Sequence, residues 1–382
     1  MFSMEYGEIH EMIRQTARDF AREEVAPSVI ERDINGEFPR EIVAKMGELG
    51  FLGMMVPEEW GGSGLDCVSY VIAMEEISKV DASVGVIMSV NNSLVCWGLE
   101  TYGTDEQKER FLRPLASGQK LGAFCLSEPE AGSDATQQHT TAEFRDGMWY
   151  LSGMKNWITN GTSADTYIVF AQTDREKRHK GITCFIIDRH TPGFEPGKKE
   201  DKLGIRSSDT CSIGLTNVAV PPENILGEAG RGFNIAMESL NGGRIGIASQ
   251  ALGIAQGAYE AALRYSKERK AFGRPIAELQ AIQMKLADMS MKIEAARLLI
   301  LKAATLKDKH ETFIKEAAQA KLFASKIAVE VALEAVQVHG GYGYVREYQV
   351  ERMLRDAKIT EIYEGTSEIQ RIVIARELLK AL

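Results

Sequence analysis

The chain has 382 residues, of which 45 are Lys or Arg and 54 are Asp or Glu, so its formal charge at pH 7 is -9. This length allows about two to three domains, and a composition of 44% hydrophobic and 26% charged residues is typical of a globular protein rather than a disordered one. The acidic balance supplies no overall positive field for nucleic acid or an anionic membrane, so we expect neither as a partner.

The first region, residues 1–120, has a helical pattern. Apolar side chains recur at spacings of three and four residues, as in an amphipathic helix. In the first such stretch they are Ile9, Met12, Ile13, Ala17 and Phe20. The run 68–77 behaves similarly, whereas Pro57 and the sequence Trp-Gly-Gly-Ser-Gly at 60–64 predict a loop. We therefore predict an N-terminal α-helical domain.

The second region, residues 121–230, changes to short runs rich in β-branched and aromatic residues, such as 167–170 and 182–187. The pair Asp146-Gly147 lies between two such runs. It predicts a β-hairpin, because Gly tolerates the positive φ of a tight turn. The pattern indicates a middle β domain built as a small sandwich or barrel.

The third region, residues 231–382, returns to a long helical pattern with apolar stripes rich in Ala. One stripe is Ile245, Ala248, Leu252, Ala255, Tyr259 and Ala262. A second is Ile282, Leu286, Met289, Ile293, Ala296, Ile300 and Ala303, and a third is Phe313, Ala317, Ala320, Ala324, Ile327 and Val331. We predict at least three long helices of a bundle whose stripes form core.

Cysteine, histidine and apolar content indicate which further features to expect. Five scattered cysteines form no disulfide framework, and neither they nor the six histidines have the spacing of metal ligands. We expect no metal and a reducing compartment. The N-terminus has no secretory signal, and no apolar run approaches the roughly 18 to 20 residues that span a bilayer. We therefore expect a cytoplasmic protein without membrane insertion.

The most informative motif is Tyr-Glu-Gly-Thr-Ser-Glu at 363–368, on a loop before a C-terminal helical run. Backbone N–H groups and hydroxyls gather at such a helix start. Two interpretations stay open from these residues alone. Thr366 or Ser367 caps the helix with Glu368 in its first turn, or the loop presents Glu364 to a ligand.

Three further segments could bind a flat or anionic ligand. Segment 124–134 with 157–161 supplies small residues, hydroxyls and Trp157, although a hairpin with a buried Trp is an equal alternative. Segment 267–276 ends a helix in a basic cluster, which suits either a helix C-terminus or a pyrophosphate. Segment 337–344 ends another helix with several glycines, and more than one Gly suggests that something lies against the backbone.

These four segments, in this order on a helical, β, helical background, resemble the acyl-CoA dehydrogenase family of flavoproteins. The likeness extends over essentially the whole chain, including the stretches 103–108 and 244–248. It implies an α+β fold with an N-terminal helical domain (1–120), a middle β-barrel or sandwich (121–230) and a C-terminal four-helix bundle (231–382). It also implies FAD as cofactor and oxidation of an acyl-CoA to its trans-2-enoyl form.

The resemblance assigns roles to individual residues. Glu364 matches the catalytic base that removes the proton next to the thioester carbonyl. The implied FAD contacts in the β region are Phe124, Leu126, Ser127, Gly132, Ser133, Trp157, Ile158 and Thr159. Those matching positions near the FAD of a neighbouring subunit are Arg269, Phe272, Gln280, Gln337, Val338, Gly340 and Gly341. Thr366 and Glu368 continue the FAD site, and the implied substrate contacts are Ser133, Asn241, Arg244 and Gly365.

The resemblance further implies a homotetramer built from dimers and an electron-transfer flavoprotein as acceptor. Asn241 departs from the Asp that is often found at its position. Because Asn caps a helix as well as Asp does, we expect the fold to be unaffected and a charged contact to the nucleotide to be lost.

Segment 88–94 looks most like the short-chain, butyryl-CoA type. We therefore expect a short linear acyl-CoA. The alternatives are a branched, alicyclic or dicarboxylic acyl-CoA, an oxidase that uses oxygen, or a cofactor-free helical scaffold.

Overall fold

The N-terminal region of the computed structural model, which describes residues 7–380, is helical as predicted. Its helices are α1 (Glu8–Phe20), α2 (Val29–Asn35), α3 (Arg40–Glu48), α4 (Cys67–Val80), α5 (Ala82–Ser89), α6 (Trp97–Tyr102), α7 (Asp105–Gln107) and α8 (Arg113–Ala116). A π-helical segment, Val90–Cys96, joins α5 to α6. The predicted loop at 60–64 separates α3 from α4.

The middle region forms one mixed seven-stranded sheet in the order β1-β4-β2-β3-β7-β6, with β5 paired to β4. Its strands are β1 (Gly122–Cys125), β2 (Thr141–Arg145), β3 (Met148–Thr159), β4 (Thr166–Gln172), β5 (Ile182–Asp188), β6 (Phe194–Pro196) and β7 (Thr210–Val220). The predicted hairpin is confirmed, since β2 and β3 are antiparallel with Arg145 opposite Met148. Both turn residues, Asp146 and Gly147, have positive φ (50° and 79°).

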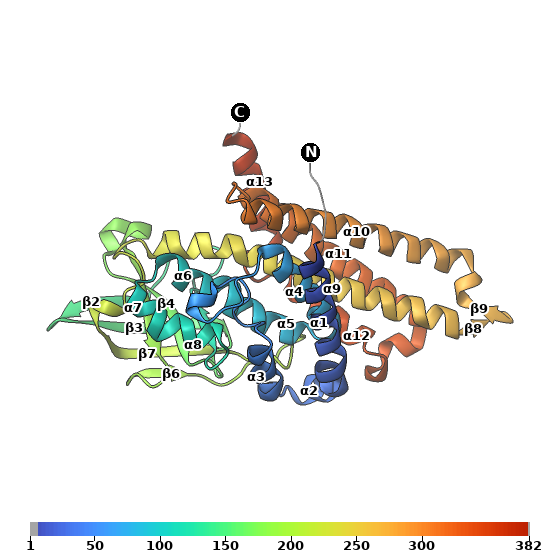
Figure 1. The fold of residues 1–382 in the computed structure, drawn as a ribbon, viewed down its shortest axis with the longest axis horizontal. Helices are drawn as coiled ribbons and strands as arrows, with labels where there is room; N and C mark the ends of the chain where they lie inside the picture. The colour runs from blue at the N-terminus through green and yellow to red at the C-terminus, as the bar shows by residue number, and fades with distance from the viewer. Residues whose placement is uncertain (1–6, 381–382) are drawn as a thin grey trace.

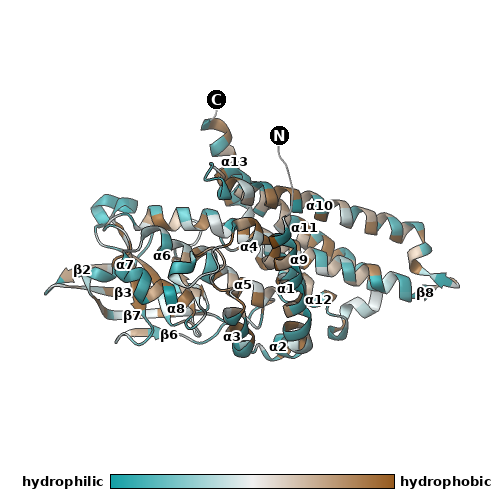
Figure 2. Ribbon diagram, viewed as in Figure 1, coloured by the Kyte–Doolittle hydropathy of each residue, from teal (hydrophilic) through white to brown (hydrophobic). Residues whose placement is uncertain are grey.

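The third region contains the long helices that the Ala-rich stripes predict. They are α9 (Gly232–Glu268), α10 (Gln280–Asp308), α11 (Ile314–His339), α12 (Val350–Ile359) and α13 (Ser367–Lys380), with a small hairpin of β8 (Lys270–Ala271) and β9 (Arg274–Pro275) after α9. The alanines of the three stripes are buried. Figure 2 shows hydrophobic and hydrophilic residues mixed along the whole of α10.

Helix α9 connects the two ends of the molecule. Its 37 residues span about 54 Å, from the strand region at one end to the β8–β9 hairpin at the other (Figure 1). It crosses α4 at close range. A Cβ on Gly253 would lie 2.6 Å from the Glu75 carbonyl oxygen, and one on Gly257 would lie 2.4 Å from that of Lys79. Glycine at these positions therefore allows the two backbones to meet.

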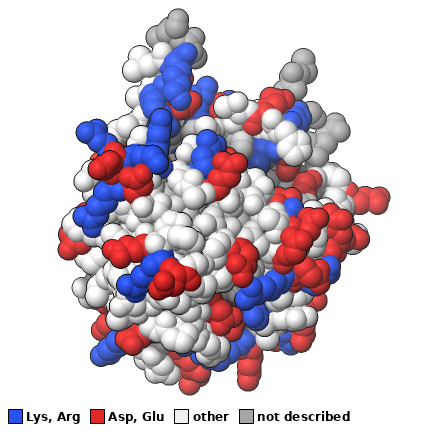
Figure 3. All heavy atoms as spheres, turned by 90° about the vertical axis from the view of Figure 1, so that its left-hand side faces the viewer, with Lys and Arg blue, Asp and Glu red and all other residues white. Residues whose placement is uncertain are grey.

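The apolar side chains form two cores. The larger core combines helices of the first and third regions with side chains from β4 and β5, whereas the smaller one lies within the strand region. The end of the molecule that faces the viewer in Figure 3 carries acidic and basic side chains around a broad uncharged area. On that face the charges do not form a field of a single sign.

The expectation that no apolar run approaches the length needed to span a bilayer was wrong. The helical stretch Ala82–Tyr102 has 21 residues and contains an 18-residue window with a mean hydropathy of 1.3, so it is long and apolar enough to cross a membrane. Within the protein 94% of this 18-residue window is buried. Its apolar character is explained by packing inside the larger core, as in the core helix of a globular protein.

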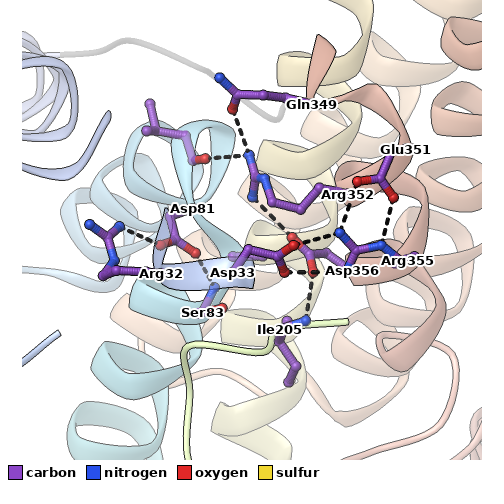
Figure 4. A network of polar contacts seen from close by, with 12 residues as sticks. Arg32, Asp33, Asp81, Ser83, Ile205, Gln349, Glu351, Arg352, Arg355 and Asp356 are labelled. Carbon is purple, nitrogen blue, oxygen red and sulfur yellow. Dashed lines mark hydrogen bonds and ion pairs between the residues drawn. The ribbon is translucent and has the colours of Figure 1, made fainter. Parts of the chain in front are cut away.

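A buried polar network joins the three regions (Figure 4). On α12, Arg352 donates to Asp356 across 3.0 Å, and the other carboxylate oxygen of Asp356 accepts from the backbone N–H of Ile205 at 2.6 Å. Arg355, on the same helix, pairs with Asp33 of α2 at 2.6 Å. The network thus fixes α12 to a loop of the strand region and to the N-terminal helices.

Removing the Asp356 carboxylate should destabilise the fold strongly. Asp356→Ala leaves the buried Arg352 guanidinium and the Ile205 N–H without this acceptor, which costs about 3–5 kcal/mol for a buried pair. Denaturant-induced unfolding monitored by circular dichroism measures the change. Asp201→Ala is the control, because its ion pair with Arg206 is exposed and should leave the midpoint nearly unchanged. Equal midpoints for the two variants would contradict a structural role for the network.

Candidate active site

Glu364 lies in a tight turn between α12 and α13, and two successive residues there have positive φ. The values are 53° for Glu364 and 92° for Gly365. Such a conformation is unfavourable for a non-glycine residue and needs support from its surroundings. Gln370 of α13 donates to the carbonyl oxygens of Glu364 (3.3 Å) and Gly365 (2.9 Å), and Lys321 of α11 donates to that of Gly365 at 2.7 Å.

The carboxylate of Glu364 points inward. Its Oε2 atom is buried and has no hydrogen-bond partner among the described residues. Burial raises the pKa of Glu364 to about 7, and the positive charges of Lys321 and Arg244 act in the opposite direction. A desolvated carboxylate that titrates near neutrality has the properties of a general base.

Helix α9 makes room for this carboxylate at Gly243. A Cβ there would lie 2.1 Å from Glu364 Oε2 and 2.8 Å from the Leu94 side chain. No side chain fits between α9 and the base, so Gly243 is part of the site. The sequence offered no signal for it, because one glycine in a helical run has many possible reasons.

Arg244, the next residue on α9, is buried beside the base. Its Nη1 donates to Asn241 Oδ1 at 2.7 Å, and its Nε has no partner among residues 7–380. Desolvation lowers the pKa of Arg244 to about 10, so it stays positively charged at neutral pH. The expectation that Asn241 caps a helix was wrong, since it lies well inside α9. It instead orients Arg244.

Hydroxyl groups line the next turn of the same α9 face. A Cβ on Gly246 would lie 2.6 Å from both Ser89 Oγ and Tyr70 Oη, and the hydroxyl of Tyr70 also contacts Ser93 at 3.3 Å. Ser89 and Ser93 belong to the segment 88–94 that the sequence singles out. The structure therefore brings that segment and the base loop to one face of α9.

Gln250 lies one turn after Gly246 on the same face of α9. Its side chain is buried, donates to the Ala82 carbonyl oxygen at 2.7 Å and accepts from the hydroxyl of Tyr363. The amide of Gln250 is thus held at both of its polar atoms, two turns along α9 from Gly243.

The two β-region segments predicted for FAD lie side by side. The backbone N–H of Asn156 donates to Ser127 O at 2.8 Å. Trp157 has a φ of 60° and is 61% exposed, so the buried-Trp alternative is excluded. Phe124 and Thr159 are half-buried, and Gly132 and Ser133 are exposed, whereas the side chains of Leu126 and Ile158 belong to the cores.

A buried ion pair that sequence reasoning missed supports this surface. Lys155 is fully buried and donates to Glu128 Oε1 at 2.7 Å and to the Leu126 carbonyl oxygen at 3.3 Å. Glu128 also accepts from the backbone N–H of Thr140 at 3.1 Å. Segment 124–134 is thereby fixed to β3. An exposed aromatic ring on such a fixed backbone suits a flat conjugated ligand.

The other predicted FAD residues lie at the far end of α9. A cavity of about 520 Å³ is lined by Arg269, Val338, Gly340 and Gly341, together with Tyr265 and His339, whose rings stack at 4.2 Å. Phe272 is 91% exposed. Gln280, at the start of α10, and Gln337, near the end of α11, are also exposed. A Cβ on Gly340 or Gly341 would meet no atom within 4 Å, so a ligand can approach their backbone. One chain does not bring these residues to the base.

The interpretation of Thr366 as a helix cap is also correct. Its hydroxyl oxygen accepts from the backbone N–H of Ile369 at 3.3 Å, three residues into α13. Glu368 is exposed in the first turn. The cap orders the end of the loop that carries Glu364, so it is compatible with the second interpretation, in which this loop presents Glu364 to a ligand.

A second cavity was missed although the sequence signals it. It has a volume of about 510 Å³ and a polar lining that includes Gln138, His139, Arg175, Arg178 and His179. The basic run at 175–180 supplies three of these side chains. In residues 7–380 no three His, Cys, Asp or Glu side chains gather where they could hold a metal ion.

Comparison with known proteins supports this description. Family models for acyl-CoA dehydrogenase match the chain as the N-terminal domain at residues 7–119, the middle domain at 123–218 and the C-terminal domain at 230–379. The short-chain specific acyl-CoA dehydrogenase of Bos taurus mitochondria is 54% identical over 99% of this chain and 92% of its own length.

Solved structures agree. Butyryl-CoA dehydrogenase from Megasphaera elsdenii superimposes with a TM-score of 0.98 at 49% identity, over 99% of this chain and 100% of its own. A chain from a structure described as "Electron transferring flavoprotein of Acidaminococcus fermentans" gives a TM-score of 0.98 at 50% identity, with the same coverage.

The three-region fold and these matches define an oxidoreductase of the flavoprotein type, and the chain belongs to the acyl-CoA dehydrogenase family. Members of this family depend on FAD and oxidise acyl-CoA thioesters. The exposed Trp157 and the open glycine backbones at 340–341 fit a flavin cofactor. The predicted fold class is confirmed, and the alternative of a cofactor-free scaffold is excluded.

Adding one methyl group at Gly243 should impair turnover while leaving the fold intact. Gly243→Ala places a Cβ against Glu364 Oε2, and displacing a reacting group by about 1 Å costs on the order of 10²-fold in rate. Steady-state kinetics with an acyl-CoA substrate measures the loss. Gly242→Ala is the matched control, because its nearest atom, Lys307 Nζ, is 3.4 Å away. Full turnover in Gly243→Ala would contradict the tight fit of the base against α9.

Proposed function

We propose that this acyl-CoA dehydrogenase oxidises a short, linear acyl-CoA to its trans-2-enoyl form, with Glu364 as the base. The observation that carries the proposal is the buried Oε2 of Glu364, which has no hydrogen-bond partner and belongs to a carboxylate with a pKa of about 7. When bound, FAD supplies the acceptor for the hydride that leaves the β carbon. The chain itself removes the proton from the α carbon.

The residues around the base explain how it works. In its ionised form Glu364 accepts the α proton, and Arg244 and Lys321 stabilise that ionised form. The backbone N–H of Glu364 has no hydrogen-bond partner among the described residues. It is therefore free to donate to the thioester oxygen, which makes the α proton more acidic. The turn at Glu364 thus supplies both the base and a polarising donor.

The choice of a short acyl chain rests on Gln250. It lies seven residues beyond Gly243 on the same α9 face, or about 10 Å along the helix. Its amide is held by Ala82 and Tyr363, so the side chain is fixed. We propose that the acyl chain lies along this face of α9, so that Gln250 limits its length.

The second cavity supports binding of the CoA nucleotide. Arg175, Arg178 and two histidines offer cations or hydrogen-bond donors, which anionic phosphates prefer. The cavity begins three residues after Ser133, a predicted substrate contact. Local cations can therefore hold an anionic ligand despite the net charge of -9.

We extend the proposal to the assembly of subunits and to the electron acceptor. Met284, Met291 and Leu298 are exposed and recur every seven residues along α10, as in a helix that packs against another subunit. A homotetramer built from dimers would cover this stripe and bring the far-end cavity near a neighbouring FAD site.

An electron-transfer flavoprotein is the proposed acceptor, supported by the family resemblance. The alternative, an oxidase, would form peroxide without that partner.

We also propose a cytoplasmic location. All five cysteines are buried and unpaired, which is compatible with a reducing compartment.

The central test is the base itself. Glu364→Gln should retain flavin and CoA binding but lose turnover by about 10²–10⁴-fold, the usual contribution of a general base. In the unmodified enzyme kcat/KM should rise with pH through about 7, because only the ionised carboxylate accepts a proton. Anaerobic flavin bleaching with butyryl-CoA measures the rate of flavin reduction in Glu364→Gln, and steady-state kinetics with the same substrate measure the pH dependence of kcat/KM. Undiminished bleaching in Glu364→Gln would assign the base to another residue.

The chain-length preference should depend on Gln250. Bleaching rates with saturated acyl-CoAs of increasing length should be highest for short chains. Gln250→Ala should move the optimum to longer chains, since each added methylene in an apolar pocket is worth about 1–3 kcal/mol. Gln256→Ala is the control on the same helix, because its amide contacts Glu260 and Arg297 and neither Ala82 nor Tyr363. An unchanged chain-length optimum in Gln250→Ala would refute the proposal that Gln250 limits the length of the acyl chain.

A further inference from the structure

Lys321 is a buried cation in the base site with no assigned function. It lies on α11, is fully buried, and its Nζ donates to the Gly365 carbonyl oxygen at 2.7 Å. Within residues 7–380 it forms no ion pair with a carboxylate. A buried ammonium group held only by a carbonyl oxygen is costly, so its retention points to a function beyond packing.

The charges around Glu364 come from several elements. The cations are Arg244 from α9 and Lys321 from α11. Burial raises the pKa of Tyr70, on α4, and of Tyr363, in the loop, so both phenols are neutral. The acidic groups Glu361 and Glu368 also act on Lys321. The base thus faces two cations and two neutral hydroxyls.

These two cations differ in what they hold. Arg244 is anchored by Asn241 within its own helix and lies next to Gly243. Lys321 instead reaches across from another helix to the turn itself, at the carbonyl oxygen directly after the base. Only Lys321 therefore combines a positive charge near the carboxylate with a hydrogen bond to the backbone that presents it.

We infer that Lys321 is a positioning residue for the base, which holds the strained turn through the Gly365 carbonyl and keeps Glu364 ionised at neutral pH by its charge. This inference rests on the proposed role of Glu364. In a dry site an opposite charge favours the ionised carboxylate, so loss of the cation moves its titration to higher pH. Desolvation lowers the pKa of Lys321 to about 8, which leaves both groups charged between about pH 7 and 8.

Three variants separate the charge from the hydrogen bond. Lys321→Met removes both, and Lys321→Gln removes the charge but keeps an N–H donor. Ser325→Ala is the matched control. Ser325 is buried one turn further along α11 and donates to Thr360 O at 2.7 Å, so it fixes the same loop without charge.

The measurements are the pH profile of kcat/KM and the carboxyl band of Glu364 in infrared difference spectra of the substrate-free holoenzyme. The Glu364→Gln spectrum assigns that band. In both Lys321 variants the acidic limb and the infrared titration should move up by about one pH unit. In Ser325→Ala neither should move, whatever the change in its thermal midpoint.

Two results would overturn the inference. An unchanged acidic limb and infrared titration in Lys321→Met and Lys321→Gln would show that the charge does not act on the base. An equal shift in Ser325→Ala would show that any loosening of the loop has the same effect. If Lys321→Met does not fold, the Gln variant decides.

The infrared titration needs no turnover. It therefore distinguishes a failure of this inference from a failure of the proposed reaction, which would appear as full activity in Glu364→Gln.

Discussion

The contact between the turn at Glu364 and helix α9 at Gly243 is the constraint on which the site depends. The carboxylate lies where a single Cβ would be 2.1 Å away, so water is excluded from one side of the base. This position requires α9 to pass beneath the turn. The helix is held there by its glycine crossings with α4, and α12, which leads into the turn, is held by the buried network around Asp356. Packing contacts far from the carboxylate, at the α9–α4 crossing and around Asp356, thus determine the position of Glu364.

Desolvation has opposite effects on stability and reactivity in this site. Burying a carboxylate oxygen without a hydrogen-bond partner is unfavourable, and the strained φ of Glu364 adds to that cost. The same burial raises the pKa of Glu364 to about 7, which gives this carboxylate the properties of a general base at neutral pH. Cations on two neighbouring helices limit the rise. The site therefore combines desolvation, which raises the pKa of the carboxylate, with positive charges that favour its ionised form.

A single chain contains two separate sets of residues predicted to approach a flavin. One set surrounds the exposed Trp157 in the strand region, and the other lines the cavity at Arg269 and Gly340. Helix α9, about 54 Å long, runs from one end of the molecule to the other. Because one chain cannot bring its own two sets together, a flavin site that uses both requires a second copy. This geometry is the physical reason for expecting an oligomer.

The sequence by itself determined the three regions, the long Ala-rich helices and the hairpin at Asp146-Gly147, because these depend on local periodicity and backbone preference. Its motifs also indicated Glu364, Arg244 and the far-end glycines. Only the tertiary structure decided that Gly243 must lack a side chain, that Asn241 orients Arg244 instead of capping a helix, and that Lys321 reaches the turn of the base. It also showed that the apolar stretch 82–102 is buried in the core. These features arise where segments distant in sequence meet, and no local pattern encodes the distance between them.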